Sequence, residues 1–336
     1  MKRNVSIQDV AKLAGVSKAT VSKYLNNVPY VSQDTKKRIE RAIQKLGFKP
    51  NSLARGLANQ SSGLIGLVIS DFENLLNMEL VKSIETEAAK QGYSIVLMST
   101  NDHEENERKI SELLGQRYGH LDGVIVAIAR EGGVDLDELQ RTFRHVVLVH
   151  RHVPTDCFDY VVVDGYVGAR LAVEYLVSLG HKRIAAISGP TDIFQFRERI
   201  RGFQDALAEH GLLDQCAVLV GGQSLTDGYR AAERVVFDHA PTAIFALSDT
   251  LAFGVLDAAK NYGWKIPGDL SLIGFNNSFF CRLARVPLTT IDARIKDIGT
   301  IAVQRLVEKI RGNNTQIKQI VLRPSLVVHE SCGAPK

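Results

Sequence analysis

The chain has 336 residues, 45% of them hydrophobic, and a formal net charge of +4 at pH 7. No apolar run approaches the roughly 20 residues that a membrane-spanning helix needs, and the amino terminus carries no secretion signal, so we expect a cytoplasmic protein without membrane segments. The four cysteines are scattered without Cys-x-x-Cys pairing and are expected to be reduced thiols.

Positive charge is concentrated in the first sixty residues. They contain twelve Lys or Arg and three Asp or Glu, whereas the remainder contains 29 and 34. Such asymmetry fits phosphate neutralisation with counterion release, as in nucleic-acid binding. The alternative is a small basic helical domain that binds no nucleic acid. The capping and turn signals in the same segment argue against that alternative.

The segment begins with the signals of a short helix and a tight turn. Ser6 and Asp9 resemble a capping box with Asp in place of Glu, and Val10 and Leu13 recur at helical spacing. Gly15 can adopt the left-handed conformation that closes such a helix. A second helix can therefore follow almost at once.

Ser17 can accept a backbone N–H as the N-cap of this second helix, which would turn Val21 inward. The outer face then presents Lys18, Ala19 and Lys23, where the side chains of a recognition helix meet base edges. The pattern is that of a helix-turn-helix.

A third helix is expected after this pair. Ser32 is its predicted N-cap, and Ile39, Ile43 and Leu46 are expected to pack beneath the first two helices. The first fifty residues thus predict an all-α headpiece that binds double-stranded DNA.

From Leu64 onward, apolar runs of strand length alternate with amphipathic helices. The first series has strands at 64–69, 94–98, 124–128 and 146–149, with helices at 77–90, 104–114 and 136–142. The second series has strands at 160–163, 184–188, 217–220, 244–247 and 270–273. This βαβ pattern predicts an α/β core of two doubly wound parallel-sheet lobes, because one sheet of about 270 residues would exceed a typical domain.

Open parallel sheets bind ligands at the carboxyl ends of their strands, and two facing lobes form a cleft there. Polar or aromatic residues follow the expected strand ends. They are Ser70, Asp71, Phe72, His150, Arg151, Asp164, Phe194 to Arg199, Ser248, Asp249, Asn276 and Asn277.

Signals for catalysis are weak. His150 and His152 have a spacing compatible with a metal, but no nearby Cys or clustered carboxylates complete a site, and solvent-edge histidines are the favoured interpretation. Gly221 and Gly222 lack the remainder of a phosphate loop or dinucleotide fingerprint. Ser188 has no evident base partner. We expect no enzyme, no metal and no cofactor.

Five motifs in the first sixty residues share their order and spacing with a known family. They are Val10-Ala-Lys-Leu-Ala-Gly-Val-Ser17, Thr20-Val-Ser22, Val31-Ser32, Leu46-Gly-Phe-Lys-Pro-Asn51 and Ala54-Arg-Gly-Leu57. The chain resembles the lactose-repressor (LacI/GalR) family of bacterial regulators, whose core resembles the periplasmic sugar-binding proteins. The resemblance implies a headpiece at 1–50, a hinge at 51–62, an N-terminal lobe at 63–163 and 293–322, and a C-terminal lobe at 164–292 and 323–336.

The resemblance also implies a DNA-binding mode. The hinge, at 51–58, would fold only on DNA and pair with the partner's hinge in the minor groove, where Leu57 would wedge into a base step. Gly56 replaces the family's commoner Ser and would weaken the hinge helix by about 1 kcal/mol relative to Ala. The expected DNA contacts are Ser6, Ser17, Lys18, Ala19, Thr20, Ser22, Lys23, Asn26, Arg55 and Leu57.

Arg199 falls on the family's arginine that holds effector hydroxyls or carboxylates through its planar fork. Asn276 stands where the family usually has Asp, and Leu75–Asn77 replaces Pro-Phe-Phe, so the ligand need not be an ordinary hexose. The expected effector contacts are Asp71, Phe72, Arg151, Asp164, Phe194, Arg199, Ser248, Asp249 and Asn276.

The functional hypothesis is a dimeric, ligand-responsive transcriptional regulator, most simply a repressor, on a palindromic operator. Its effector is expected to be a sugar or sugar derivative. The predicted dimer faces are 80–84, 251–256 and 278–283. A regulator that senses a nucleoside, a phosphorylated sugar or a protein partner is the first alternative. A solute-binding module without DNA selectivity is the second.

Overall fold

The computed structural model describes residues 5–25, 31–48, 61–72, 74–153, 157–313 and 316–336. The chain divides into two compact units, residues 1–62 and 63–336, each of which is described by itself. The predicted DNA contacts Asn26, Arg55 and Leu57 lie outside the described residues, as does the predicted hinge from residue 51 to residue 60.

The first unit contains the three expected helices, α1 (Ile7–Ala14), α2 (Lys18–Leu25) and α3 (Gln33–Leu46). The capping box at the start of α1 is confirmed, since the Asp9 backbone N donates to Ser6 Oγ at 3.3 Å and the Ser6 backbone N donates to Asp9 Oδ2 at 2.9 Å. Gly15 closes α1 in the left-handed conformation, with φ +64°. The Thr20 backbone N donates to Ser17 Oγ at 3.1 Å at the start of α2.

A small apolar core holds these helices together. Val10, Val21 and Ile39 are fully buried within it, one from each helix. Leu13 is instead 45% exposed, because the buried stripe of α1 passes through Val10, Ala11 and Ala14.

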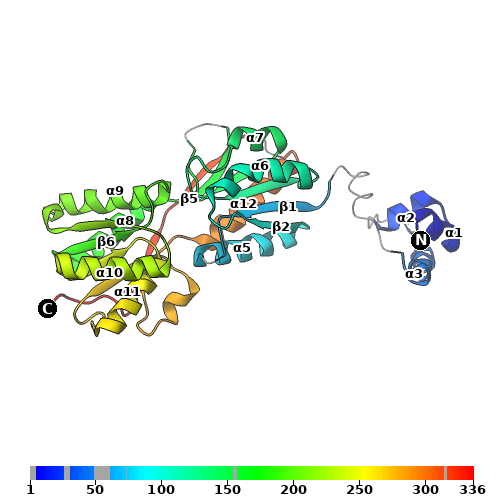
Figure 1. Cartoon of the computed structure of the whole chain (residues 1–336). Coiled ribbons are helices and arrows are strands. Elements are labelled where there is room, and N and C mark those ends of the chain that lie inside the picture. The colour runs from blue at the N-terminus through cyan, green and yellow to red at the C-terminus, as the bar shows by residue number, and fades with distance from the viewer. Residues whose placement is uncertain (1–4, 26–30, 49–60, 73, 154–156, 314–315) are drawn as a thin grey trace. The chain divides into compact units, whose positions relative to one another are not determined.

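The second unit has two lobes, each built on a six-stranded sheet (Figure 1). The sheet of the first lobe has the order β11-β5-β4-β3-β1-β2, and all its pairings are parallel. Its strands are β1 (Leu64–Ile69), β2 (Ser94–Ser99), β3 (Gly123–Ala127), β4 (Val146–Val149), β5 (Asp159–Val163) and β11 (Gln319–Leu322). Its helices are α5 (Leu75–Gln91), α6 (Glu104–Tyr118), α7 (Leu136–Thr142) and α12 (Ile295–Ile310).

The sheet of the second lobe has the order β12-β10-β9-β8-β6-β7, with only the β10–β12 pair antiparallel among the described pairings. Its strands are β6 (Ile184–Ser188), β7 (Ala217–Val220), β8 (Ala243–Ala246), β9 (Ser271–Asn276), β10 (Thr289–Asp292) and β12 (Ser325–Val327). Its α-helices are α8 (Gly165–Ser178), α9 (Phe194–Glu209), α10 (Leu225–His239) and α11 (Asp249–Tyr262). Short 3₁₀ turns lie at Leu213–Gln215 and Phe279–Arg282.

The predicted class, a helical headpiece followed by two doubly wound α/β lobes, is confirmed. The division into two series of strands is wrong for one run: 160–163 opens the second series, but β5 pairs with β4 and β11 in the first sheet. The lobe boundary after residue 163, which the resemblance implies, leaves this strand in the first lobe. Helix α12 also returns to the first lobe, where it packs against α5 and against β3, β4 and β5. These pairings are set by long-range packing, which the local pattern does not specify.

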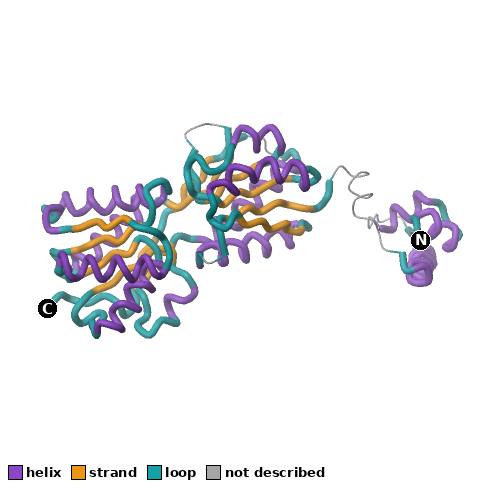
Figure 2. The backbone as a smooth tube through the Cα atoms, in the orientation of Figure 1, coloured by secondary structure: helices purple, strands orange, loops and turns teal. Residues whose placement is uncertain are grey.

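Helices cover both faces of each sheet. Figure 1 shows α8 and α9 on one side of the second sheet and α10 and α11 on the other. Figure 2 shows the strands of each lobe as a central layer between helices. Both strand faces are therefore buried, which explains why β1, β3, β4 and β6 read as continuous apolar runs. Among the described residues, no helix has the length and apolar character needed to cross a membrane.

Candidate DNA-binding face and effector cleft

The exposed side of α2 carries the residues expected to meet DNA. Lys18, Ala19 and Lys23 are exposed there, and Thr20 and Ser22 are half-buried. The predicted contacts Ser6 and Ser17 are exposed at the two helix starts, but their hydroxyls already accept backbone N–H bonds as N-caps. Within α2, Lys18 and Lys23 are the charged donors of this face.

The turn before α2 is held by a basic side chain from α3. Arg38 Nη2 donates to the carbonyl oxygens of Ala14 and Gly15 at 2.6 and 3.0 Å. This contact satisfies carbonyls at the end of α1 and places α2 relative to α3. The tight turn thus depends on the third helix as well as on Gly15.

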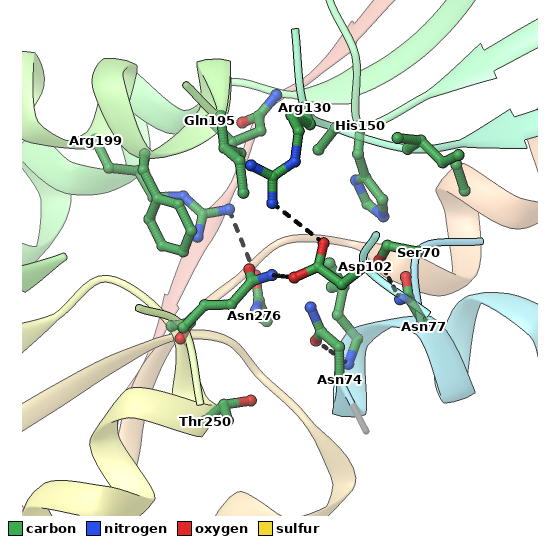
Figure 3. Close-up of a pocket in the computed structure, with 18 of the residues that line it drawn as sticks. Ser70, Asn74, Asn77, Asp102, Arg130, His150, Gln195, Arg199, Thr250 and Asn276 are labelled. Carbon is green, nitrogen blue, oxygen red and sulfur yellow. Dashed lines mark hydrogen bonds and ion pairs between the residues drawn. The ribbon is translucent and has the colours of Figure 1, made fainter. Parts of the chain in front are cut away.

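A cleft lies between the two lobes of the second unit, at the carboxyl ends of their strands (Figure 3). From the first lobe, the polar residues that line it include Ser70, Asn74, Asn77, Asp102, Arg130 and His150. From the second lobe they are Gln195, Arg199, Gln223, Ser248, Thr250 and Asn276. The free volume of this cleft is about 70 Å³, below the roughly 300–1,000 Å³ of ordinary ligand pockets. The lobes are therefore close together in this structure.

Arg199, on α9, is the central basic group of the cleft. Its Nη1 donates to the Leu247 carbonyl oxygen at 2.6 Å, and its Nη2 lies 3.5 Å from Asn276 Oδ1. Its guanidinium carbon lies 3.6 Å from the centroid of the Phe275 ring. Burial lowers the pKa of Arg199 to about 9, so the group remains cationic at neutral pH.

His150 follows β4 with a left-handed backbone, φ +61°. Burial, with a smaller contribution from the Arg199 charge, lowers its pKa to about 4, so the imidazole is neutral at physiological pH. His152 stacks on the Phe194 ring at a centroid distance of 4.9 Å. The two histidines are therefore engaged separately, and no group of three or more His, Cys, Asp or Glu among the described residues is placed to hold a metal.

Several buried polar atoms in the cleft have no hydrogen-bond partner within the protein. They are both amide atoms of Gln195, both carboxylate oxygens of Glu107, Nε2 of His150, Nε of Arg130 and Nε of Arg199. Buried polar groups are normally paired, so these atoms are suited to a polar ligand or to water. They come from both lobes.

Direct contacts between the lobes surround the cleft. Arg130 Nη1 donates to Asp192 Oδ2 at 2.5 Å, and its Nη2 lies 3.4 Å from Asp102 Oδ1. Asp102 also accepts from Gln223 Nε2 at 3.2 Å. Arg197 forms a further ion pair with Glu131. Of these contacts, Arg130–Asp192, Asp102–Gln223 and Arg197–Glu131 join the first lobe to the second, whereas Arg130–Asp102 lies within the first lobe.

Three of the predicted effector contacts, Arg199, Ser248 and Asn276, line the cleft. Ser248 also serves as the N-cap of α11. Asn276 ends β9 with φ +121°, a conformation that Asn tolerates better than most residues.

The other predicted effector contacts do not line the cleft, and four of them have protein partners. Asp249 is buried, and its two oxygens accept from the Ser278 backbone N at 2.7 Å and from Thr290 Oγ1 at 2.6 Å. Asp164 caps α8, and Asp71 accepts from the Asn74 backbone N at 2.7 Å. Phe194 stacks on His152.

The remaining two are Phe72 and Arg151, which are not among the residues that line the cleft. Phe72 is 53% exposed, and Arg151 is buried with Nη1 unpartnered near Glu107. Neither side chain contributes to the lining of the cleft.

Sequence reasoning missed six polar residues that line the cleft, namely Asn74, Asp102, Glu107, Arg130, Gln223 and Thr250. Asp102 follows β2, Arg130 follows β3 and Gln223 follows β7, so the strand-end rule applied to every strand would have included them. Gln195 lies within the segment 194–199 that was proposed as a whole, and Thr250 directly follows Ser248-Asp249.

Comparison with known proteins matches both units. The family described as "Bacterial regulatory proteins, lacI family" matches residues 6–51, and the "Periplasmic binding protein-like domain" matches residues 173–332. The HTH-type transcriptional regulator DegA of Bacillus subtilis (strain 168) is 34% identical over 97% of each chain. The chain belongs to the lacI family. It is a DNA-binding transcriptional regulator and not an enzyme.

Other regulators also match over nearly the whole chain. Catabolite control protein A of Priestia megaterium is 34% identical over 96% of this chain and 97% of its own. The crystal structure of the Lac repressor dimer bound to operator and the anti-inducer ONPF matches with a TM-score of 0.85 and 26% identity, over 99% of this chain and 100% of that one. The regulator CelR in complex with cellobiose matches with a TM-score of 0.70 and 27% identity, over 97% and 99%.

Proposed function

We propose that this lacI-family protein is a dimeric repressor whose operator affinity is controlled by a small ligand, a sugar or sugar derivative, bound in the cleft between the lobes. The observation that supports this proposal is that buried polar atoms without a partner, from both lobes, face this one cleft. A ligand that bonds to both lobes changes the free energy of one lobe arrangement relative to another.

The mechanism is linkage between the cleft and the headpiece. A ligand in the cleft competes with or strengthens the Arg130–Asp192 and Arg197–Glu131 contacts, and so selects a relative lobe angle. That angle sets the separation of the two hinges of a dimer. A coupling of about 1–3 kcal/mol changes operator affinity by roughly 5- to 150-fold.

On the operator, Lys18, Ala19 and Lys23 would face base edges or nearby phosphates. The hinge would order on DNA with Leu57 in the minor groove. Such a regulator acts in the bacterial cytoplasm, where its operator is accessible. We further propose that the chain passes from one lobe to the other after residues 163, 292 and 322. The strand order of the two sheets supports these boundaries.

Of the three predicted dimer faces, 278–283 carries exposed apolar side chains, whereas 80–84 and 251–256 contain side chains that are buried within the protomer. Leu80, Ile84 and Leu251 are fully buried inside the protomer and are not available to a partner. Exposed apolar side chains nearby are Met78, Phe279, Phe280 and Leu283. We propose these as the apolar part of a two-fold interface.

The deciding experiment is a fluorescence titration of the purified protein against a palindromic operator pool, at two salt concentrations, with and without sugars, sugar phosphates and nucleosides. Sequence-selective, salt-dependent binding that one compound changes would support the proposal. Operator binding that no compound alters would refute the ligand-controlled mechanism. Ligand binding without DNA selectivity would favour a solute-binding role.

A further inference from the structure

A second cavity lies in the first lobe, at the edge of its sheet opposite to the cleft. Its free volume is about 500 Å³, within the roughly 300–1,000 Å³ of ordinary ligand pockets. This amino-edge pocket is lined by residues of 140–146, 157–158 and 309–312 and by Ile317. These segments lie at the starts of the neighbouring parallel strands β4, β5 and β11 and at the ends of α7 and α12. The cleft lies at the carboxyl ends of the strands, so the two sites are separate.

The charged side chains among the described residues that line the amino-edge pocket are all basic. They are Arg144, Lys309 and Arg311. His145 lies among them, and burial, followed by the charges of Arg144 and Lys309, lowers the pKa of its imidazole. The opposite effect of the Asp122 charge is smaller than that of either cation. The cations therefore act on one region of the pocket.

Two carboxylates next to the pocket are balanced by other cations. Asp159 is fully buried and pairs with both Arg305 and Lys309. Glu308 pairs with Arg305 at 2.9 Å and with Lys318 at 3.8 Å. The charges of Arg144 and Arg311 are left over from this balance.

These two arginines also have donors available. Among the described residues, Arg144 forms no ion pair and no side-chain hydrogen bond, and its side chain is exposed. Arg311 is bonded to Tyr93 and to the Gln91 carbonyl oxygen, the latter from Nη2 at 3.1 Å, and both of these partners are uncharged at neutral pH. The ends of α7 and α12 each contribute about half a negative charge, which offsets roughly one of the two cations. An anion in the pocket would still meet net positive charge.

The pocket has an apolar wall beside its basic groups. Phe143, Val146 and Phe158 are each at most 5% exposed, and Ile310 is half-buried. A ligand that fits this lining combines an apolar body with an anionic group. Guanidinium groups match the paired oxygens of a phosphate, and a phosphate monoester carries up to two negative charges at neutral pH, whereas a carboxylate carries one. The several cations therefore favour a phosphate.

We propose that the amino-edge pocket binds a small organic phosphate, with its phosphoryl group at Arg144 and Arg311 and its apolar body against Phe143 and Ile310. The DNA backbone offers the same phosphate chemistry, but a concave pocket with an apolar wall suits a free small molecule better. The site is additional to the cleft, and the inference holds whether or not a ligand binds there.

The test uses phenyl phosphate, benzoate and phenol as probes in calorimetric titrations of the full chain at pH 8, where the phosphate is a dianion. We expect phenyl phosphate to bind at least about 10-fold more tightly than either of the others, because charge-assisted hydrogen bonds are the stronger ones. Cys157 is exposed and lines the pocket. Bound phenyl phosphate should therefore slow the alkylation of Cys157 by iodoacetamide, and the rate at Cys216, which lies outside the pocket, should not change.

Substitutions assign the binding to this pocket. Arg144→Gln should weaken the binding of phenyl phosphate at least about 10-fold and remove the protection of Cys157. Arg311→Gln should have the same effect. Arg141→Gln is the matched control, because Arg141 is exposed on α7 and does not line the pocket. Arg144 is exposed and makes no bond that the fold needs, so its variant tests binding and not folding.

Three results would overturn the inference. The first is no binding of phenyl phosphate at millimolar concentration, and the second is binding that Arg144→Gln leaves unchanged, which would place the ligand elsewhere. The third is benzoate binding as tight as that of phenyl phosphate, which would exclude a phosphate-specific site. A DNA duplex without an operator serves as the last probe. If it displaces phenyl phosphate and its own binding is weakened by Arg144→Gln, the ligand is the DNA backbone and the small-molecule site is refuted.

Discussion

Glu107 should make the stability of the core fall as the pH rises through neutrality. Its side chain, on α6, is fully buried, and neither carboxylate oxygen has a hydrogen-bond partner within the protein. Arg130 Nε lies 3.8 Å from Oε2, and Arg130 is itself paired with Asp102 and Asp192. Burial outweighs this attraction and raises the pKa of Glu107 from 4.5 to about 7.

The sign follows from linkage. A carboxyl whose pKa is higher in the folded than in the unfolded chain binds its proton more tightly when folded, so its contribution to stability is complete below about pH 4.5 and is lost as the pH rises through about 7. A pKa difference of about 2.5 units, at 1.36 kcal/mol per unit, corresponds to roughly 3 kcal/mol.

Glu107→Gln keeps the shape of the protonated side chain and removes its titration. At pH 8 the variant should therefore be more stable than the parent chain by about 3 kcal/mol, whereas at pH 4 the two should be equally stable. The measurement is urea unfolding of the core at a series of pH values. Glu112→Gln is the matched control, because Glu112 is exposed on the same helix. A difference between parent and Glu107→Gln that does not depend on pH would refute the argument, and destabilisation at pH 8 would show that the Arg130 pairing dominates.

Three further predictions concern the headpiece and the lobes. Lys23→Ala should relax specificity at one base pair of each half-site in operator-library binding, and equal weakening on all sequences would instead identify a phosphate contact. Ile39→Ala should lower the free energy of unfolding of the headpiece by about 2–5 kcal/mol, because Ile39 is fully buried in its core. In calorimetry the unfolding transition of residues 63–336 should stay unchanged, and a shift of both transitions would contradict this prediction. Asp192→Asn removes the 2.5 Å ion pair to Arg130, a partly exposed contact between the lobes worth roughly 0.2–1 kcal/mol. Its loss should favour a more open arrangement of the lobes, which small-angle scattering would detect as a larger radius of gyration. An unchanged radius would mean that other contacts keep the lobes together.

The short-range features of the chain were predictable from sequence. The Ser6–Asp9 capping box and the left-handed Gly15 each depend on residues within a few positions of one another, and the structure has both as expected. The strands β1, β4, β6 and β7 begin and end at the expected residues, because each is a continuous apolar or β-branched run between polar turns.

The partners of each strand required the tertiary structure. β10 and β11 are only four residues long and were not predicted, and β5 was assigned to the wrong series. The role of the Asp249 carboxylate also required the tertiary structure. Asp249 follows a strand as a ligand contact should, yet its oxygens bond to Ser278 and Thr290, which lie far along the chain.

The local sequence thus determined the three headpiece helices, most strands of the two sheets, the charge of the headpiece and the position of Arg199 near a strand end. The tertiary structure alone decided which side chains share that cleft and which charges are neutralised there. The reason is that hydrogen bonds, burial and pKa depend on neighbours brought together by packing, and Arg130, Asp102 and Gln223 are such neighbours from three different strand ends.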